Sequence, residues 1–157
     1  MNGRNAIVKF VAMLFGMGLA NAAFAVIPAA TELPIAATGL QKFVPGEDRP
    51  VVFRIDRSEA KTAAGDASRR LAGCTLEGTA HLEAKNQRIT IKNARIKCPA
   101  ETKATKKMPV GPIEGQILGL DRKTGLRVTC KYQPGCHLGT LRDGDTGFFL
   151  ISKPFGG

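Results

Sequence analysis

The chain has 157 residues, a net charge of +10, four cysteines, one tyrosine and no tryptophan. This length corresponds to one globular domain that is large enough to bury a hydrophobic core. Any disulfides would therefore reinforce the fold and would not substitute for a core. The positive charge favours anionic partners, whereas the scarcity of aromatic side chains disfavours sequence-specific recognition of nucleic-acid bases.

The first 25 residues have the pattern of a cleavable secretory signal peptide. Arg4 and Lys9 give a positive start, an apolar run covers residues 10–20, and residues 23–25 (AFA) supply the small residues that signal peptidase requires. The run is shorter than the about 20 residues of a membrane-spanning helix, and an uncleaved anchor is the alternative. We expect cleavage after Ala25, a periplasmic location and no later membrane span. Loss of Arg4 and Lys9 then lowers the net charge from +10 to +8.

Residues 26–50 contain four prolines and show no sustained period of 3.6 or 2. This composition predicts an extended arm, and such segments bind neighbouring proteins as added strands or ordered wraps. The arm would precede a single β-domain over residues 51–157. Within that domain, Val51, Phe53 and Ile55 alternate with Val52, Arg54 and Asp56, which predicts a first, half-buried strand. Residues 58–70 form a short helix or a loop that ends near Gly65.

Two segments, residues 71–84 and 88–98, predict an antiparallel hairpin in which the numbers of paired residues sum to 172. This register pairs Cys74 with Cys98, Leu76 with Ile96, Glu77 with Arg95 and Leu82 with Thr90. It gives a disulfide, apolar pairs on one face and an opposite-charge pair on the other. Ile89 and Ile91 then fall on the polar face, so this end of the hairpin is either covered by another strand or bulged.

The C-terminal half predicts further strands separated by turns. Strands are expected at residues 113–120 and 126–132, joined by a hairpin loop at residues 121–125, and a last strand at residues 147–152. Turns are expected at residues 133–135 and 142–145. The pattern indicates an all-β fold, a small antiparallel barrel or sandwich reinforced by disulfides.

Four cysteines in an exported chain predict two disulfides. The hairpin register favours a bridge from Cys74 to Cys98, and the intervening Pro-Gly turn favours one from Cys130 to Cys136. A zinc site formed by Cys130, Cys136 and His137 is the alternative, although the spacing is not that of a zinc finger or ribbon.

No recognisable catalytic or cofactor-binding motif occurs in the sequence. His81 falls on the outer face of the predicted hairpin. Asp143 and Asp145 flank Gly144, but two carboxylates fall short of the six to eight oxygens that calcium takes, so a turn explains them better. We therefore expect no catalytic residue, no cofactor and no metal.

Positive charge is concentrated between residues 81 and 107. The candidate basic contact surface consists of Lys92, Arg95, Lys97, Lys103, Lys106 and Lys107. Electrostatic contact of this surface with an anionic component of the cell envelope or with a partner protein remains open. The alternative is that these charges only keep an exported domain soluble, since no run of five or more like charges occurs.

An ordered series of short segments resembles the TraB/TrbI family of conjugation proteins. The segments are residues 50–55 (PVVFRI), 74–78 (CTLEG), 88–98 (RITIKNARIKC), 113–117 (IEGQI) and 125–127 (GLR), and the resemblance spans about residues 35–130. In that family a periplasmic β-barrel domain helps build the outer-membrane core of type IV secretion systems. The resemblance implies a non-enzymatic structural subunit that packs against copies of itself or against other subunits.

The chain departs from the family pattern in several ways. Family members are typically longer and carry an inner-membrane helix, a proline-rich stretch and a helical segment that reaches the outer membrane. Here a signal-like segment replaces the anchor, and residues 131–157 match no part of the family pattern. Two other functions remain open: a free cationic periplasmic binding module or inhibitor, and a small secreted hydrolase.

Overall fold

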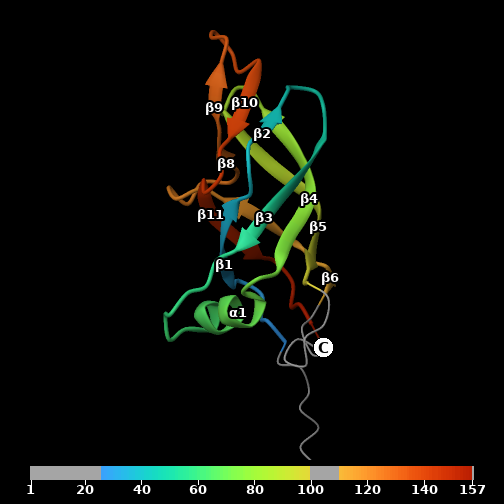
Figure 1. Cartoon of the computed structure of the whole chain (residues 1–157), viewed down its shortest axis with the longest axis vertical. Coiled ribbons are helices and arrows are strands. Elements are labelled where there is room, and N and C mark those ends of the chain that lie inside the picture. The colour runs from blue at the N-terminus through green and yellow to red at the C-terminus, as the bar shows by residue number, and fades with distance from the viewer. Residues whose placement is uncertain (1–25, 100–109, 157) are drawn as a thin grey trace, which may run out of the picture.

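A computed structural model describes residues 26–99 and 110–156. The expected signal peptide and three lysines of the basic surface, Lys103, Lys106 and Lys107, lie outside these residues. Within them the chain forms one helix and a series of strands (Figure 1). In chain order these are β1 (Glu32–Ala37), β2 (Gln41–Phe43), β3 (Arg49–Ile55), α1 (Ala63–Leu71), β4 (Thr75–Glu83), β5 (Arg88–Lys97), β6 (Gly111–Pro112), β7 (Gly115–Leu118), β8 (Leu126–Arg127), β9 (Thr129–Lys131), β10 (Leu138–Leu141) and β11 (Thr146–Ile151).

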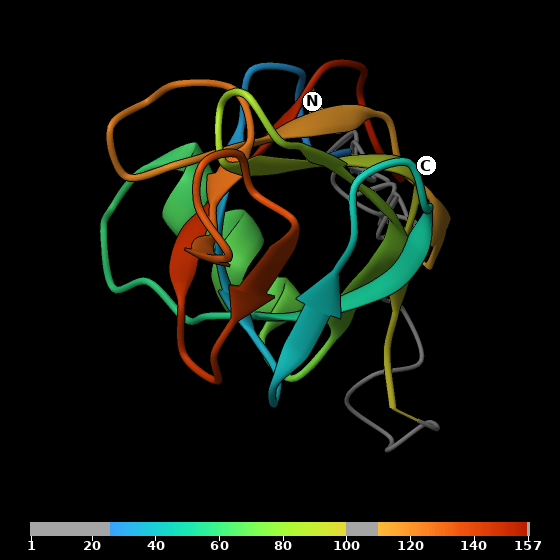
Figure 2. The ribbon, with the colours of Figure 1, turned by 90° about the horizontal axis from the view of Figure 1, so that it is seen from above.

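The strands form a curled, barrel-like antiparallel sheet, in agreement with the predicted fold class. Its order is β6-β5-β4-β3-β1-β11-β7, and β8 pairs with β5 on the side that faces β7. A bridge between Leu118 and Gly125 links the end of β7 to the start of β8. The wall thus curves round until its two ends meet, and the strands enclose a rounded interior when seen from above (Figure 2).

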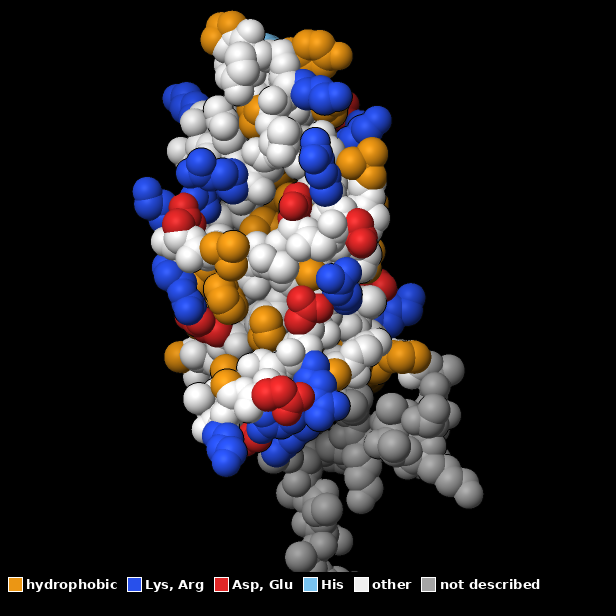
Figure 3. Space-filling model, turned by 60° about the vertical axis from the view of Figure 1, so that its left-hand side comes forward, with side chains coloured by type: hydrophobic (Ala, Val, Ile, Leu, Met, Phe, Trp, Pro, Cys, Tyr) orange, Lys and Arg blue, Asp and Glu red, His pale blue; other side chains and the backbone are white. Residues whose placement is uncertain are grey.

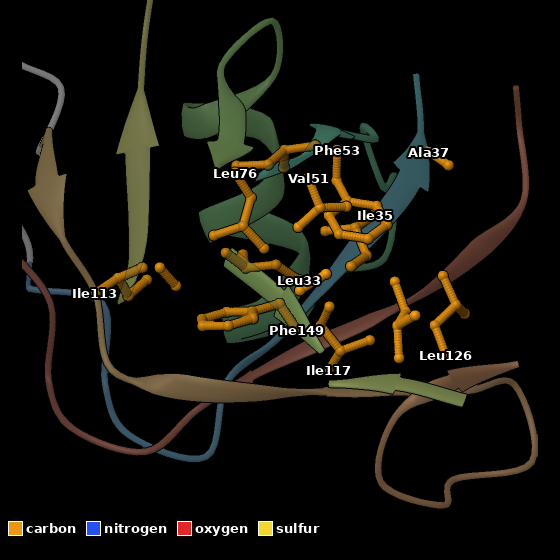
Figure 4. Packing of buried hydrophobic residues seen from close by; sticks show 14 of the residues in the cluster. Leu33, Ile35, Ala37, Val51, Phe53, Leu76, Ile113, Ile117, Leu126 and Phe149 are labelled. Carbon is orange, nitrogen blue, oxygen red and sulfur yellow. The ribbon is translucent and has the colours of Figure 1, made fainter. Parts of the chain in front are cut away.

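Apolar side chains fill this interior because alternate residues of each strand point inward. Leu33, Ile35, Phe53, Leu76 and Phe149 are all fully buried. Figure 4 shows these side chains converging from β1, β3, β4 and β11. Full burial of such a side chain contributes roughly 1.5–3 kcal/mol, so the interior is the main source of stability.

Different elements cover the two ends of the barrel. At one end lies α1, whose Ala67 and Leu71 are buried; the hydroxyl of Thr62 caps the helix by accepting a hydrogen bond from the Gly65 backbone N–H at 3.1 Å. At the other end is a three-stranded sheet in the order β2-β10-β9, whose Phe43 and Leu141 are buried. The two layers close the interior from opposite ends (Figure 1).

The short helix is confirmed, but its predicted end at Gly65 is wrong. Gly65 lies in the first turn, and a Cβ atom there would lie 1.9 Å from the carbonyl oxygen of Ala60. This glycine is needed because the preceding loop folds directly against the helix, and it does not terminate the helix.

The expectation of a separate arm at residues 26–50 is corrected by the structure. The segment is extended, but β1 lies inside the sheet between β3 and β11, and its Leu33 and Ile35 are fully buried. Ile27 is also buried and forms a bridge to Phe155. The prolines favoured an arm, although Pro34 lies at an outward position between the buried Leu33 and Ile35 and leaves their alternation intact.

The β4–β5 hairpin follows the predicted register only over its first part. Thr75, Leu76 and Glu77 pair with Lys97, Ile96 and Arg95, as predicted. Beyond Gly78 the register shifts by one residue, so Leu82 faces Ile89 and the predicted pairing of Leu82 with Thr90 is wrong.

A β-bulge in β5 causes the shift. Two residues, Asn93 and Ala94, lie opposite Gly78, and Asn93 adopts a left-handed conformation with φ 53°, which asparagine tolerates better than most residues. Ile91 then pairs with Ala80 on the inner face, and a Cβ atom on Gly78 would lie 2.6 Å from the Ile91 side chain. The bulge therefore returns the isoleucines of this end to the core.

In the C-terminal half, the predicted hairpin at residues 121–125 is wrong. The strand β7 pairs with β11, whereas β8 pairs with β5 and β9 pairs with β10. The predicted strand at residues 126–132 is thus two short strands that join different sheets. The turns at residues 133–135 and 142–145 and the last strand are confirmed.

Candidate functional site

Both predicted disulfides are confirmed. Cys74 bonds to Cys98 with Cα atoms 4.1 Å apart, and Cys130 bonds to Cys136 with Cα atoms 5.1 Å apart. A zinc site would need Cys130 and Cys136 as thiolates, but here each sulfur is bonded to the other. The zinc alternative is therefore excluded in this oxidised state.

The two histidines lie on different elements. His81 is on the outer face of β4, as predicted, and its Nδ1 lies 2.9 Å from Oδ1 of Asp48, with both side chains partly exposed. His137 is exposed in the connection between β9 and β10. The hydrogen bond from His81 ties β4 to the chain just before β3.

Asp143 and Asp145 serve the turn between β10 and β11. Oδ1 of Asp143 accepts a hydrogen bond from the backbone N–H of Gly39 at 2.9 Å, and Oδ2 of Asp145 accepts one from the N–H of Arg142 at 2.8 Å. These bonds favour the interpretation of the pair as a turn. Among the described residues, no group of three or more histidine, cysteine, aspartate or glutamate side chains is placed to hold a metal ion.

The described part of the predicted basic surface lies on the outside of β5. Lys92, Arg95 and Lys97 are exposed. Glu77 of β4 reduces the positive charge here, since it lies opposite Arg95 in the register and its carboxylate is 3.8 Å from the Lys97 ammonium. This surface is therefore only partly positive.

Arg88, at the start of β5, has a role that sequence reasoning missed. Its side chain is only 7% exposed because the β7–β8 connection covers it, and it donates a 2.7 Å hydrogen bond to the carbonyl oxygen of Gly125 and another bond to Asp121. The hydrogen bond from Arg88 holds the pKa of the Asp121 carboxyl below its ordinary value of 3.8. Arg88 thus fastens the seam where the barrel closes. No sequence signal marks it, because its partners lie more than 30 residues away.

A second positive surface also escaped prediction. It lies on the outer face of the β2–β10–β9 sheet, where Lys42 and Lys131 are exposed. Lys42 and Lys131 come from separate parts of the chain, so only their common pairing with β10 brings them together.

No protein-family model matches the chain, and no curated protein matches it significantly. Within residues 26–99 and 110–156, we find no helix with the length and apolar composition required to cross a bilayer.

Proposed function

We propose that this protein is a non-enzymatic structural subunit of a periplasmic assembly, of the kind that builds conjugation and type IV secretion systems. The observation that carries the proposal is the arrangement of the segments that resemble the TraB/TrbI family. They contribute to β3, β4, β5, β7 and β8. The first three and β8 are consecutive neighbours in the sheet, and β7 meets β8 at the Leu118–Gly125 bridge. The resemblance therefore follows one continuous wall of a barrel.

The use of buried polar groups supports a scaffold role. The buried polar or charged side chains of the described residues are Thr31, Ser68 and Arg88. Thr31 donates to the Pro28 carbonyl, and Ser68 donates to the Gly65 carbonyl. Arg88 binds the β7–β8 connection. Each buried polar group thus holds the fold together, and the interior is occupied by apolar side chains.

Strand edges offer one way to assemble. In the described part of the chain, β9 pairs only with β10, and β6 pairs only with β5. The backbone groups on the second edge of such strands can accept a further strand from a partner, a common mode of protein recognition. With β1 inside the sheet, these edges replace the expected arm as the sites for contact with a neighbouring subunit.

The proposed location rests on the signal-like segment together with the two disulfides. Disulfides persist in oxidising compartments such as the bacterial periplasm, and both cystines join residues that the fold places side by side. The periplasm also contains the assemblies to which the resemblance points.

Purification of a tagged chain from cells tests this proposal. We expect it to elute as part of a large complex with outer-membrane secretion subunits, and we expect deletion of its gene to reduce conjugal transfer. The matched control is the same chain without residues 2–25, which would stay in the cytosol and purify without these subunits. A strictly monomeric protein, together with unchanged transfer after deletion, would remove the proposal.

A further inference from the structure

The outer face of the β2–β10–β9 sheet carries positive charge in a regular arrangement. Phe43, Gly139 and Leu141 face inward. The pairing therefore places Lys42, Thr140 and Thr129 in one outward row, and Leu138 and Lys131 in the next. Arg127 precedes Thr129 by two residues and is exposed, but it belongs to β8, which pairs with β5 in the larger sheet. From strand spacings of about 4.8 Å and a rise of about 3.3 Å per residue, the backbone positions of Lys42 and Lys131 lie roughly 12 Å apart.

No carboxylate interrupts this face among the outward residues of β2, β9 and β10. Within the described part of the chain, Lys42, Arg127 and Lys131 form none of the ion pairs that neutralise most other basic side chains. Asp143 and Asp145 lie beyond the end of β10, where they stabilise the following turn. Unlike the outside of β5, where Glu77 lies between the cations, the outward residues of this sheet carry positive charge without a carboxylate among them.

A projecting loop adjoins the positive face. The connection between β9 and β10 lies at the end of the molecule opposite α1 (Figure 1). Its Tyr132 is 71% exposed, Pro134 is also exposed, and the Cys130–Cys136 bond closes the loop. At this end of the space-filling view, hydrophobic side chains stand beside a histidine, with lysine and arginine side chains below them (Figure 3). Because the disulfide already restricts the loop, little conformational entropy is lost when it binds.

We propose that this face and its loop bind the surface of a bilayer that contains anionic phospholipids. Each lysine or arginine near such a surface strengthens binding about fivefold. Tyrosine is enriched at membrane interfaces, where its ring contacts the acyl boundary and its hydroxyl stays hydrated. Lys42 and Lys131 would contact lipid phosphates, and Tyr132 would enter the headgroup region. The proposal does not depend on membership of a secretion assembly.

The geometry favours a lipid surface over single-stranded nucleic acid. Nucleic-acid grooves combine positive charge with several aromatic side chains on which successive bases stack. Here Tyr132 is the one strongly exposed aromatic residue in the described part of the chain, and it stands on a projecting loop. A projecting aromatic loop beside a positive face suits a flat, anionic surface.

Co-sedimentation with lipid vesicles tests the proposal. The protein is purified in the form that cells accumulate, with its N-terminus determined, and mixed with phosphatidylglycerol–phosphatidylcholine vesicles or with pure phosphatidylcholine vesicles. The first variant is Lys42→Gln with Lys131→Gln. The matched control is Lys92→Gln with Arg95→Gln, which removes the same charge from β5. All variants share one N-terminus, so any contribution from that segment cancels in the comparison.

We expect binding to the anionic vesicles alone, weakened by salt. The Lys42→Gln and Lys131→Gln pair should reduce it about 30-fold, with a much smaller loss in the control pair. Tyr132→Ser should cause a further loss that persists at high salt.

Equal losses in both pairs, equal binding to neutral vesicles, or no binding to anionic vesicles at low salt would overturn the proposal. Tighter binding to a single-stranded oligonucleotide, lost in the same variant, would assign the face to nucleic acid. Because these side chains are exposed, all variants should unfold at the same temperature as the parent protein.

Discussion

The two disulfides lie at opposite ends of the barrel and have different structural roles. Cys74–Cys98 joins residues 24 apart at the end near α1, and Cys74 is only 1% exposed. Cys130–Cys136 joins residues only 6 apart in a loop whose Tyr132 is 71% exposed. The first bond fastens two strands of the barrel wall, whereas the second fixes the shape of a projecting surface loop. The same covalent link therefore serves stability at one end and recognition at the other.

The largest effect is expected from the buried bond. Replacing Cys74 and Cys98 by serine should lower the free energy of unfolding by about 2–5 kcal/mol, the usual range for loss of a native disulfide. The longer closed loop and the burial of a hydroxyl at the Cys74 position both act in this direction. Urea denaturation followed by circular dichroism measures the loss. If this loss were smaller than the loss caused by replacing Cys130 and Cys136, the assignment of the stabilising role to the Cys74–Cys98 bond would be wrong.

The seam where the barrel closes, at the β7–β8 connection, is held without a covalent bond. Arg88→Met should lower the free energy of unfolding by about 1.5–3 kcal/mol, because the Gly125 carbonyl loses a charged hydrogen-bond donor. Arg127 provides the control, since it lies directly opposite Arg88 in the register but is exposed. Arg127→Met should change stability by no more than about 0.5 kcal/mol. Equal effects in the two variants would show that Arg88 does not fasten the seam.

The exposed disulfide should matter less for stability than for binding. Replacing Cys130 and Cys136 by serine should cost about 2 kcal/mol or less, since a short loop loses little entropy on closure. Vesicle binding should weaken at the same time, because the loop around Tyr132 is no longer restrained. Denaturation and co-sedimentation of one sample measure both effects. Unchanged vesicle binding would show that the loop around Tyr132 does not contribute to lipid binding.

The smallest expected effect concerns pH. The pKa of Asp121 is lowered in the folded protein by its hydrogen bond from Arg88, relative to the ordinary value of 3.8. The resulting stabilisation is present above pH 3.8 and is lost as the pH falls through the lowered pKa. Asp121→Asn should therefore flatten the acid side of the stability profile and leave its slope near neutral pH unchanged. A profile identical to that of the parent protein would contradict this role.

The sequence predicts local pairing well and long-range pairing poorly. The Glu77–Arg95 pair and the Cys74–Cys98 bond could be predicted because the numbers of paired residues have a constant sum in a regular hairpin. The bulge at Asn93 changes this sum by one. The only indication of it in the sequence was that the regular register placed Ile89 and Ile91 on the polar face. The strand β1 was missed because the prolines of residues 26–50 favoured an arm, while its burial depends on β3 and β11, which are distant in sequence.

The same limit applies to the candidate contact surface. Charge density along the chain pointed to Lys92, Arg95 and Lys97, but density in sequence takes no account of Glu77 on the neighbouring strand. Lys42 and Lys131 are far apart in sequence, and each is unremarkable in its own segment. They share a face only because β2 and β9 flank the same strand, β10.

Mass spectrometry of the protein isolated from cells without reduction tests the central claim most directly, namely that an exported, disulfide-linked barrel presents surfaces to partners. After blocking of free thiols, we expect an N-terminus at Val26, one peptide pair linked through Cys74 and Cys98, and another through Cys130 and Cys136. An intact Met1 together with four blocked, unlinked cysteines would contradict it.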